Sequence, residues 1–336
     1  MRILVADRLP DRFEEAMEAR GHECVVDADL SEASLPGALA GVHVLVVRST
    51  RVTADAFSAD GSLRLVVRAG SGTNTIDLDE ASRTGVLVAN VPGRNSVAVA
   101  ELTLGLLLAV DRAIPDNTGE LRAGRWDKKR FAAVGRGLYG RSLGIVGLGN
   151  IGLAVAERAA GFGMRLFAQA KGSRAPEVTQ RIDQLGIELI PDLVALASRV
   201  DVLSLHVPLK AETRGMVGAD VLDALQPGIL LNTSRADVVD TKALLARLDA
   251  GGLSAGLDVF PDEPGSSSAE WQSPLAAHPR VVGTHHIGAS TQQAQEAVID
   301  GVEEIINAFD AGELLNIVNK PSQQPGHPVA ESGAAR

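Results

Sequence analysis

The stretch "LGIVGLGNIG", residues 143–152, decides the fold class of this chain. A short apolar run, typical of a buried strand, leads directly into Gly147, Gly149 and Gly152, and an alanine-rich helical stretch follows at 153–163. Glycines at this spacing permit a tight turn, a close approach of the backbone to a bound group, and close packing of the helix on the strand. The first turn of such a helix also offers free N–H groups to an anion. The stretch therefore predicts a strand–turn–helix unit that binds the pyrophosphate of a dinucleotide.

Short runs rich in Val, Ile and Leu alternate with helical stretches on both sides of this motif. Before the motif they lie at 2–6, 23–26, 42–47, 63–67 and 86–91; from the motif onward they lie at 143–147, 164–168, 201–207, 228–234, 253–260 and 280–285. Continuous apolar strands of this kind indicate parallel sheets that are covered on both faces. Two sets of strands therefore predict an α/β chain with two doubly wound parallel-sheet domains.

Two helical stretches indicate how the domains are connected. The apolar stretch 96–110 lies between the two sets of strands, and we expect it to carry the chain across. Because one chain can hardly bury such a helix by itself, we also expect it to hold a homodimer together. A long amphipathic stretch begins near residue 290 and is predicted to return to the first domain. The tail, 319–336, is polar, rich in Pro and Gly, and predicted to be disordered.

Composition limits the classes of function open to the chain. Its 336 residues are enough for two domains, and a net charge of −10 argues against nucleic acid or an anionic membrane as the main partner. The single cysteine, Cys24, lies in an apolar run, so we interpret it as a core residue in a reducing compartment. The N-terminus lacks the pattern of a signal peptide, and the longest apolar run is too short to span a bilayer. We therefore expect a cytoplasmic protein with no membrane partner.

Four further motifs follow the glycine motif in a characteristic order. They are "LSLHVPL" at 203–209, "NTSRADVVD" at 232–240, "GLDVFPDEP" at 256–264 and "HHIGAST" at 285–291. In this order they resemble the D-isomer-specific 2-hydroxyacid dehydrogenases, and the resemblance extends from about residue 2 to residue 318. The stretches "VRSTRVT", "VRAGSGTNTIDL", "NSVAVAELTLGLLL" and "RWDKKRF" look most like the 3-phosphoglycerate dehydrogenase branch of that family.

The resemblance implies a particular domain arrangement. A Rossmann-type cofactor domain, residues 98–289, would be inserted into a flavodoxin-like substrate domain made of residues 1–97 plus 290–318. We expect the long regulatory C-terminal extension of some members of the branch to be missing. No metal site is expected.

Oxidation of a 2-hydroxy acid needs a cation for the carboxylate and a base for the hydroxyl proton. Arg235 follows an apolar strand, and a guanidinium binds a carboxylate at two points. The residues alone leave open whether His285 or His286 is the base, and whether Asp262 or Glu263 supports it. The family register selects His286 as the acid/base and Glu263 as its acid partner, with Arg235 as the polarising cation.

The predicted substrate is a small anionic 2-hydroxy or 2-keto acid. Arg48 and Arg68 both follow apolar strands, and two guanidiniums there suit a second anion such as a phosphate. In the family the next loop, here Ala69, Gly70, Ser71 and Gly72, holds the substrate carboxylate. We therefore expect 3-phosphoglycerate first, with glyoxylate, hydroxypyruvate or a phosphonate analogue as alternatives. The basic residues 128–130 either add positive field, across a dimer, or form a solvated turn.

The cofactor is predicted to be NAD(H) or NADP(H). The motif and the resemblance together select Gly147, Gly149, Asn150, Ile151, Gly152, Ala170, Lys171, Ser173, Arg174, His206, Val207, Pro208, Thr233 and Asp258 as cofactor-binding residues. Ala170 stands where the family usually has the Asp that binds the adenosine ribose, so no carboxylate would repel a 2′-phosphate there. Lys171, Ser173 and Arg174 could bind such a phosphate. The family favours NAD(H), whereas these local residues favour NADP(H).

A protein of a different class could carry the same motifs. NAD(H)-sensing transcriptional corepressors share this fold, bind peptide partners and resemble the chain at the same three catalytic motifs. The arginines suited to a phosphate favour an enzyme over a corepressor.

Overall fold

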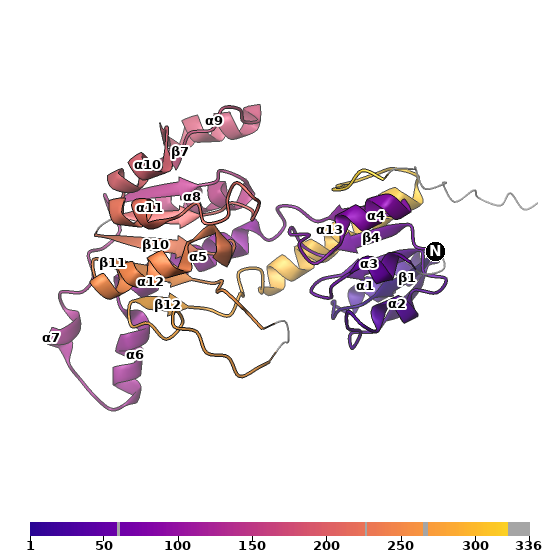
Figure 1. Cartoon of the computed structure of the whole chain (residues 1–336), viewed down its shortest axis with the longest axis horizontal. Coiled ribbons are helices and arrows are strands. Elements are labelled where there is room, and N and C mark those ends of the chain that lie inside the picture. The colour runs from indigo at the N-terminus through magenta and orange to yellow at the C-terminus, as the bar shows by residue number, and fades with distance from the viewer. Residues whose placement is uncertain (59–60, 226, 265–267, 322–336) are drawn as a thin grey trace, which may run out of the picture. The chain divides into compact units, whose positions relative to one another are not determined.

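The computed structural model describes residues 1–58, 61–225, 227–264 and 268–321. The chain forms two compact units (Figure 1). Unit 1 comprises Met1–Asn95 together with the chain from Thr291 onward, and unit 2 comprises Ser96–Ser290. The sequence placed the boundaries at 97/98 and 289/290, within two residues of these points. Which unit holds the cofactor and which the substrate stays a prediction.

Over its described residues, unit 1 is built on five parallel strands. They are β1 (Arg2–Val5), β2 (Glu23–Val26), β3 (Val44–Val47), β4 (Leu65–Arg68) and β5 (Leu87–Asn90), in the spatial order β2-β1-β3-β4-β5. The helices are α1 (Arg12–Ala19), α2 (Leu35–Ala38), α3 (Ala54–Phe57), α4 (Leu78–Thr84) and α13 (Gln292–Asp310). The strand order is the flavodoxin-like one that the sequence predicted.

Alternating side chains of these strands pack on two helical layers. Ile3 and Val5 face the side of α1 and α13, whereas Leu4 between them faces the side of α2, α3 and α4. Cys24 in β2 is buried, and burial, followed by the charges of Glu14 and Glu18, raises the pKa of its thiol to about 11. The cysteine is therefore a core residue, as the sequence indicated.

The segment after α13 covers the outer edge of β5. Ile317 pairs with Ala89 in an antiparallel bridge. The Asn319 side chain accepts a hydrogen bond from the Val88 N–H at 2.8 Å and donates one to the Val86 carbonyl at 2.8 Å. The predicted disordered tail is therefore wrong for Asn319, because two backbone groups hold its amide. The rest of that prediction, from residue 322 onward, lies outside the described residues.

In unit 2 the described residues form a sheet of seven parallel strands. The strands are β6 (Ser142–Val146), β7 (Arg165–Gln169), β8 (Glu188–Ile190), β9 (Val202–Leu205), β10 (Gly228–Asn232), β11 (Leu253–Leu257) and β12 (Val281–Gly283), in the order β12-β11-β10-β9-β6-β7-β8. The helices are α5 (Ser96–Asp111), α6 (Ile114–Arg122), α7 (Lys128–Phe131), α8 (Asn150–Gly161), α9 (Pro176–Leu185), α10 (Leu193–Arg199), α11 (Ala219–Ala224) and α12 (Thr241–Ala250), with a 3₁₀ turn at Ala236–Val238. This order is the Rossmann order with one further strand, β12, at one edge. The sequence missed β8, a three-residue edge strand with two exposed residues, because its apolar run is too short to indicate a strand.

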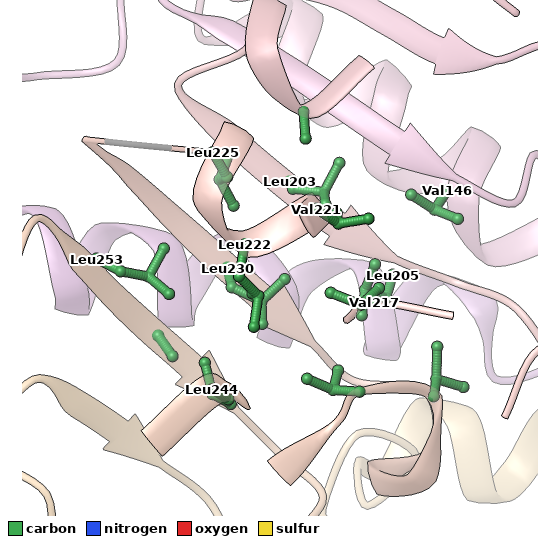
Figure 2. Packing of buried hydrophobic residues seen from close by; sticks show 14 of the residues in the cluster. Val146, Leu203, Leu205, Val217, Val221, Leu222, Leu225, Leu230, Leu244 and Leu253 are labelled. Carbon is green, nitrogen blue, oxygen red and sulfur yellow. The ribbon is translucent and has the colours of Figure 1, made fainter. Parts of the chain in front are cut away.

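The sheet of unit 2 is buried on both faces. Figure 2 shows one of the two cores, in which Leu203 and Leu205 of β9 lie among side chains such as Val221 and Leu222 of α11. The opposite face packs against α5, α8 and α9. Burial on both faces explains why the strands read as continuous apolar runs.

The apolar helix α5 is covered mostly by unit 2 itself. It packs against α8, β10 and β11, and among its large apolar side chains Val97 alone is exposed. The reason given for a homodimer at this helix is therefore wrong, because the chain buries the helix without a second copy. The homodimer itself stays a prediction. No helix in the described ranges is both long and apolar enough to cross a membrane.

Residues 112–136, which we call the arm, lead from α5 toward β6. The helices of the arm, α6 and α7, contain no buried residue, and in Figure 1 they stand away from the sheet of unit 2. A buried ion pair closes the base of the arm, with 2.7 Å between Asp111 Oδ1 and Arg141 Nη1. The Gly137 N–H donates to the other oxygen of Asp111 at 2.9 Å.

Candidate active site

The turn between β6 and α8 has room for glycine alone at two positions. A Cβ on Gly147, whose φ is +99°, would lie 2.4 Å from the His206 carbonyl oxygen. A Cβ on Gly152 would lie 1.9 Å from the Gly147 carbonyl oxygen. Gly149 differs, because a Cβ there would meet open space beside the start of α8. That helix has no side-chain cap and no acidic residue in its first turn, so its N–H groups and this open space fit a pyrophosphate.

Strand pairing places the other cofactor candidates along the same edge of the sheet. Val146 of β6 pairs with Leu205 of β9, Leu205 pairs with Asn232 of β10, and Asn232 pairs with Leu257 of β11. The residues that follow these strands, namely Asn150, Ile151, His206, Val207, Pro208, Thr233 and Asp258, therefore lie on neighbouring connections at the carboxyl edge. In open α/β sheets this edge is where ligands bind.

His206 is held as a neutral side chain. Its Nε2 shares a hydrogen bond of 2.8 Å with the Ser204 hydroxyl. Burial lowers the pKa of His206 to about 3. Thr233, the candidate that follows β10, shares a hydrogen bond of 2.9 Å with Thr103 of α5. A hydrogen bond to a neighbouring residue therefore holds each of these side chains at the carboxyl edge of the sheet.

The turn after β7 contains no acidic residue between Gln169 and Arg174. Arg174 donates from Nη2 to the Gln169 carbonyl at 2.7 Å and from Nη1 to the Lys171 carbonyl at 3.2 Å. Ala170, Lys171 and Ser173 are exposed. The Arg174 guanidinium thus shapes the turn. The turn exposes N–H, hydroxyl and ammonium donors, and this set of donors suits an anion rather than a ribose diol.

Glu263 and His286 form a hydrogen-bonded pair. Glu263 Oε2 lies 2.7 Å from His286 Nδ1, and Glu263 Oε1 accepts from the Phe260 N–H at 2.6 Å. Burial by itself raises the pKa of the Glu263 carboxyl, but the hydrogen bonds from His286 and Phe260 outweigh burial and, with the charges of His286 and Arg235, lower it below its usual value. Because the ionised carboxylate can only accept, Nδ1 carries the proton and Nε2 stays available for proton transfer.

Arg235 is fixed on the neighbouring strand connection. It follows Thr233 and Ser234 in the turn after β10, and its Nη1 donates to the Ser234 carbonyl at 2.6 Å. The Asn232 amide donates to the Arg235 carbonyl at 2.9 Å and accepts from Ser234, both N–H and hydroxyl. Burial lowers the pKa of Arg235, and the charge of Glu263 offsets part of that shift. The guanidinium remains protonated and lies within electrostatic reach of the Glu263–His286 pair.

The three catalytic candidates thus follow three adjacent strands. Arg235 follows β10, Glu263 follows β11 and His286 follows β12. His285 is exposed, and no hydrogen bond of its side chain occurs in the described part of the chain.

The substrate candidates lie in unit 1, at the carboxyl edge of its sheet. Arg48 follows β3, and Arg68 ends the adjacent β4. The Asp7 carboxylate accepts from the backbone N–H groups of Arg48, Ser49 and Thr50 at 2.6 to 3.2 Å and fixes that turn.

The loop Ala69–Gly72 is also held by side chains. Gly70 has φ +147°, and a Cβ there would lie 1.5 Å from the Arg68 guanidinium and would displace it. Asn90 donates to the Ser71 carbonyl at 2.6 Å, and the Ser71 hydroxyl donates to Asn95 Oδ1 at 3.2 Å.

Sequence reasoning missed two residues that shape these loops, Asp7 and Asn232. Asn232 ends β10 and Asp7 closely follows β1, both at a carboxyl edge, and each binds the backbone of a loop that carries a candidate residue. A polar residue at the end of an apolar strand was the available signal.

Comparison with known proteins finds relatives of the same fold along nearly the whole chain. A family model for the NAD-binding domain of D-isomer-specific 2-hydroxyacid dehydrogenases matches residues 104–288. A D-3-phosphoglycerate dehydrogenase of Methanocaldococcus jannaschii is 38% identical over 327 residues, which cover 96% of this chain and 60% of that protein. A hydroxypyruvate reductase of Thermotoga maritima is 38% identical over 308 residues, which cover 90% of this chain and 97% of that protein. A solved structure, the NADPH-dependent glyoxylate/hydroxypyruvate reductase of Sinorhizobium meliloti, has a TM-score of 0.82 and 32% identity, and the match covers 97% of this chain and 99% of that one.

The strand order and the glycine turn define unit 2 as a Rossmann-type α/β domain. With these matches, the chain belongs to the D-isomer-specific 2-hydroxyacid dehydrogenase family. It spans about 60% of the length of the D-3-phosphoglycerate dehydrogenase it matches.

Proposed function

We propose that this protein is an NAD(P)-dependent D-2-hydroxyacid dehydrogenase. The observation that carries the proposal is the Glu263–His286 hydrogen bond of 2.7 Å, at the same edge of the unit 2 sheet as Arg235 and the glycine turn. A base supported by a carboxylate, a cation and a dinucleotide turn together provide what the oxidation of a 2-hydroxy acid requires.

The reaction divides between these residues as follows. His286 Nε2 removes the proton of the C2 hydroxyl, while Glu263 holds Nδ1 and stabilises the imidazolium that forms. Arg235 binds the substrate carboxylate and polarises the C2 oxygen. A nicotinamide cofactor held at the β6–α8 turn would supply the acceptor for the hydride of C2. In the reverse direction His286 returns the proton to the oxygen.

The substrate we favour is 3-phosphoglycerate, with 3-phosphohydroxypyruvate as its oxidised form. Arg48 and Arg68 end adjacent strands and can bind a second anion, and the loop Ala69–Gly72 can hold the carboxylate through its N–H groups. The relative from Methanocaldococcus jannaschii carries that name. We therefore propose that the arginines of unit 1 bind the phosphate and that residues of unit 2 carry out the chemistry.

A second candidate substrate is hydroxypyruvate or glyoxylate. It is favoured by the reductase of Thermotoga maritima, which this chain matches over 97% of its length, and by the Sinorhizobium meliloti structure. In that case the two arginines would serve a single small acid.

The cofactor we favour is NADP(H), with NAD(H) as the alternative. Ala170 removes the ribose carboxylate, and Lys171, Ser173 and Arg174 provide donors in the turn after β7. Two of the solved relatives are described in complex with NADPH or NADP. The residues of this chain that support NADP(H) lie in one turn, so the preference can be tested there.

Steady-state turnover tests the proposed function. We expect oxidation of 3-phosphoglycerate with NAD(P), and a rise of roughly tenfold or more in KM in Arg48→Ala, since a charged hydrogen bond contributes about 1.5–3 kcal/mol. For unphosphorylated glycerate the same variant should change KM much less. The neighbouring exposed Arg51 supplies the matched control, because Arg51→Ala should change neither KM.

Three results would contradict parts of this proposal. Equal effects of Arg48→Ala on both substrates would remove the phosphate site. Turnover of hydroxypyruvate alone would select the second candidate. Tight binding of NAD(P)H with no turnover of any of these acids would favour the corepressor class.

A further inference from the structure

The loop that carries His286 is fixed by a carboxylate to which the proposed reaction assigns no step. Asp258 follows β11 and is 1% exposed. Its Oδ1 accepts from the Thr284 hydroxyl at 2.6 Å and from the Ile287 N–H at 2.9 Å, and its Oδ2 accepts from the Gly288 N–H at 2.9 Å. The carboxylate therefore binds residues on both sides of the histidine.

The charge of Asp258 makes these contacts obligatory. The three donors are a hydroxyl and two backbone N–H groups, all neutral. A buried carboxylate is costly unless hydrogen bonds meet its charge, so the loop must keep its donors turned toward Asp258. A Cβ at position 288 would lie 3.1 Å from Asp258 Oδ2, a tight contact that would shift the carboxylate by a few tenths of an ångström.

The backbone of the loop needs such a constraint. His286 has φ +53°, in the left-handed region that residues other than glycine rarely adopt. A residue remains in this region only where its surroundings fix it. The bonds from Asp258 to residues 284, 287 and 288 bracket His286 and fix it there.

A buried polar side chain at a strand end also holds the neighbouring Arg235. Asn232 binds the turn that carries Arg235, and the Asp258 N–H donates to the Asn232 carbonyl at 3.0 Å. The ends of β10 and β11 are thus joined, and each end fixes one catalytic candidate.

We infer that Asp258 is a positioning residue, which holds the loop 284–288 so that His286 presents Nδ1 to Glu263 and leaves Nε2 for proton transfer. The inference rests on the proposed function for its kinetic consequence. It assigns Asp258 a role different from the direct cofactor contact that the family resemblance implies.

The test uses the full chain with Asp258→Asn. This variant keeps the size of the side chain but replaces one accepting oxygen with an NH₂ group that faces a backbone N–H. The first measurement is the tautomer of His286, read from ring nitrogen shifts at about pH 8.5, where an ordinary imidazole is neutral. We expect the Nδ1–H tautomer in the wild type and a shift toward the Nε2–H tautomer in Asp258→Asn.

The second measurement separates positioning from cofactor contact. We expect kcat to fall by roughly tenfold or more, in the range typical of lost acid/base catalysis. The Kd of NAD(P)H and the KM of the acid substrate should each stay within about threefold, a change of under ~1 kcal/mol. A loss of NAD(P)H affinity as large as the loss of kcat would overturn the inference, and so would an Nε2–H tautomer in the wild type.

Two further variants make the test decisive. Asp111→Asn changes another buried carboxylate, at the base of the arm, and should leave the His286 tautomer unchanged. Thr284→Val removes one of the three donors and should shift the tautomer in the same direction as Asp258→Asn, so it decides the matter if Asp258→Asn does not fold. An unchanged tautomer in Thr284→Val and Asp258→Asn would overturn the inference. Because the tautomer is measured without turnover, it remains decisive even if the proposed function fails.

Discussion

Both members of the acid/base pair depend on a left-handed backbone conformation that residues other than glycine rarely adopt. His286 has φ +53°, and Asp262, directly before Glu263, has φ +56°. Each such residue costs about 1–3 kcal/mol and persists where tertiary contacts over-determine it. The hydrogen bonds of Glu263 to Phe260 and His286 supply such contacts on one side of the pair.

The pair predicts which of the two adjacent histidines matters. Replacing His286 by Ala should lower kcat by about 10²–10⁴-fold, because the group that exchanges the hydroxyl proton is lost. His285→Ala is the matched control and should keep kcat close to wild type, since His285 is exposed and is not part of the pair. Circular dichroism should show both variants folded. A near-normal kcat in His286→Ala would contradict the proposed role.

His206 predicts a pH dependence of stability. Its pKa is about 3 in the folded chain, whereas an unfolded histidine has a pKa near ~6.5. Between these values the unfolded chain binds the extra proton, so folding stability decreases as the pH falls through this window. His206→Gln should remove that term and reduce the slope of unfolding free energy against pH by up to about 1.4 kcal/mol per pH unit. Urea unfolding of both proteins at several pH values between these pKa values measures the slopes, and equal slopes would contradict the prediction.

At the scale of elements, the connections at the carboxyl edge of the unit 2 sheet have different roles. The β6–α8 turn offers helix N–H groups and open space, whereas the ends of β10 and β11 each hold a buried polar residue that binds a loop. The turn between β7 and α9 differs from these connections, because it is exposed and its backbone is held by the side chain of Arg174. Cofactor preference can therefore be changed there without altering the catalytic loops.

The β7–α9 turn predicts how that preference can be reversed. Ala170→Asp should improve kcat/KM for NADH relative to NADPH by roughly tenfold or more, because the carboxylate binds the ribose hydroxyls and repels a 2′-phosphate. Gly172→Asp adds the same charge two residues away, where a Cβ meets nothing within 4 Å, and should have a smaller effect. Equal effects of both variants would point to bulk charge. A wild type that already prefers NADH by about a hundredfold, ~2.7 kcal/mol, would end the NADP(H) proposal.

At the scale of the whole molecule, five exposed large apolar side chains lie on or next to the arm in sequence, whereas α5 exposes one, Val97. They are Ile114, Leu121, Trp126, Val134 and Tyr139, and Trp126 and Tyr139 are 81% and 90% exposed. Large apolar groups exposed together mark a surface that binds another protein. We therefore predict that the homodimer, if formed through an apolar surface, uses the arm.

Light scattering tests this placement. We expect a dimer at micromolar concentration, and a shift to monomer in the double variant Leu121→Lys and Trp126→Ser. Val97→Ser changes the exposed apolar residue of α5 and should leave the dimer intact. A monomeric wild type, or a monomer produced by Val97→Ser alone, would contradict the arm as the interface.

The sequence by itself determined the features that depend on residues close together in the chain. The spacing of Gly147, Gly149 and Gly152 predicts the turn, and the steric limit at Gly152 comes from the Gly147 carbonyl within that turn, whereas the limit at Gly147 comes from the distant His206 carbonyl. The apolar runs predict buried parallel strands, because a strand covered on both faces cannot alternate. The family motifs selected Glu263 and His286, and the structure places them 2.7 Å apart; their roles stay predictions.

Tertiary structure alone decided the features that depend on which connections become neighbours. Asp258 and the loop 284–288 are 26 to 30 residues apart, and only the pairing of β11 with β12 brings them together. The burial of α5 also follows from sheet packing, since the same apolar helix could as well have faced a second chain. Buried polar groups must find hydrogen-bond partners and apolar faces must find cover, but the sequence pattern does not say which distant segment supplies them.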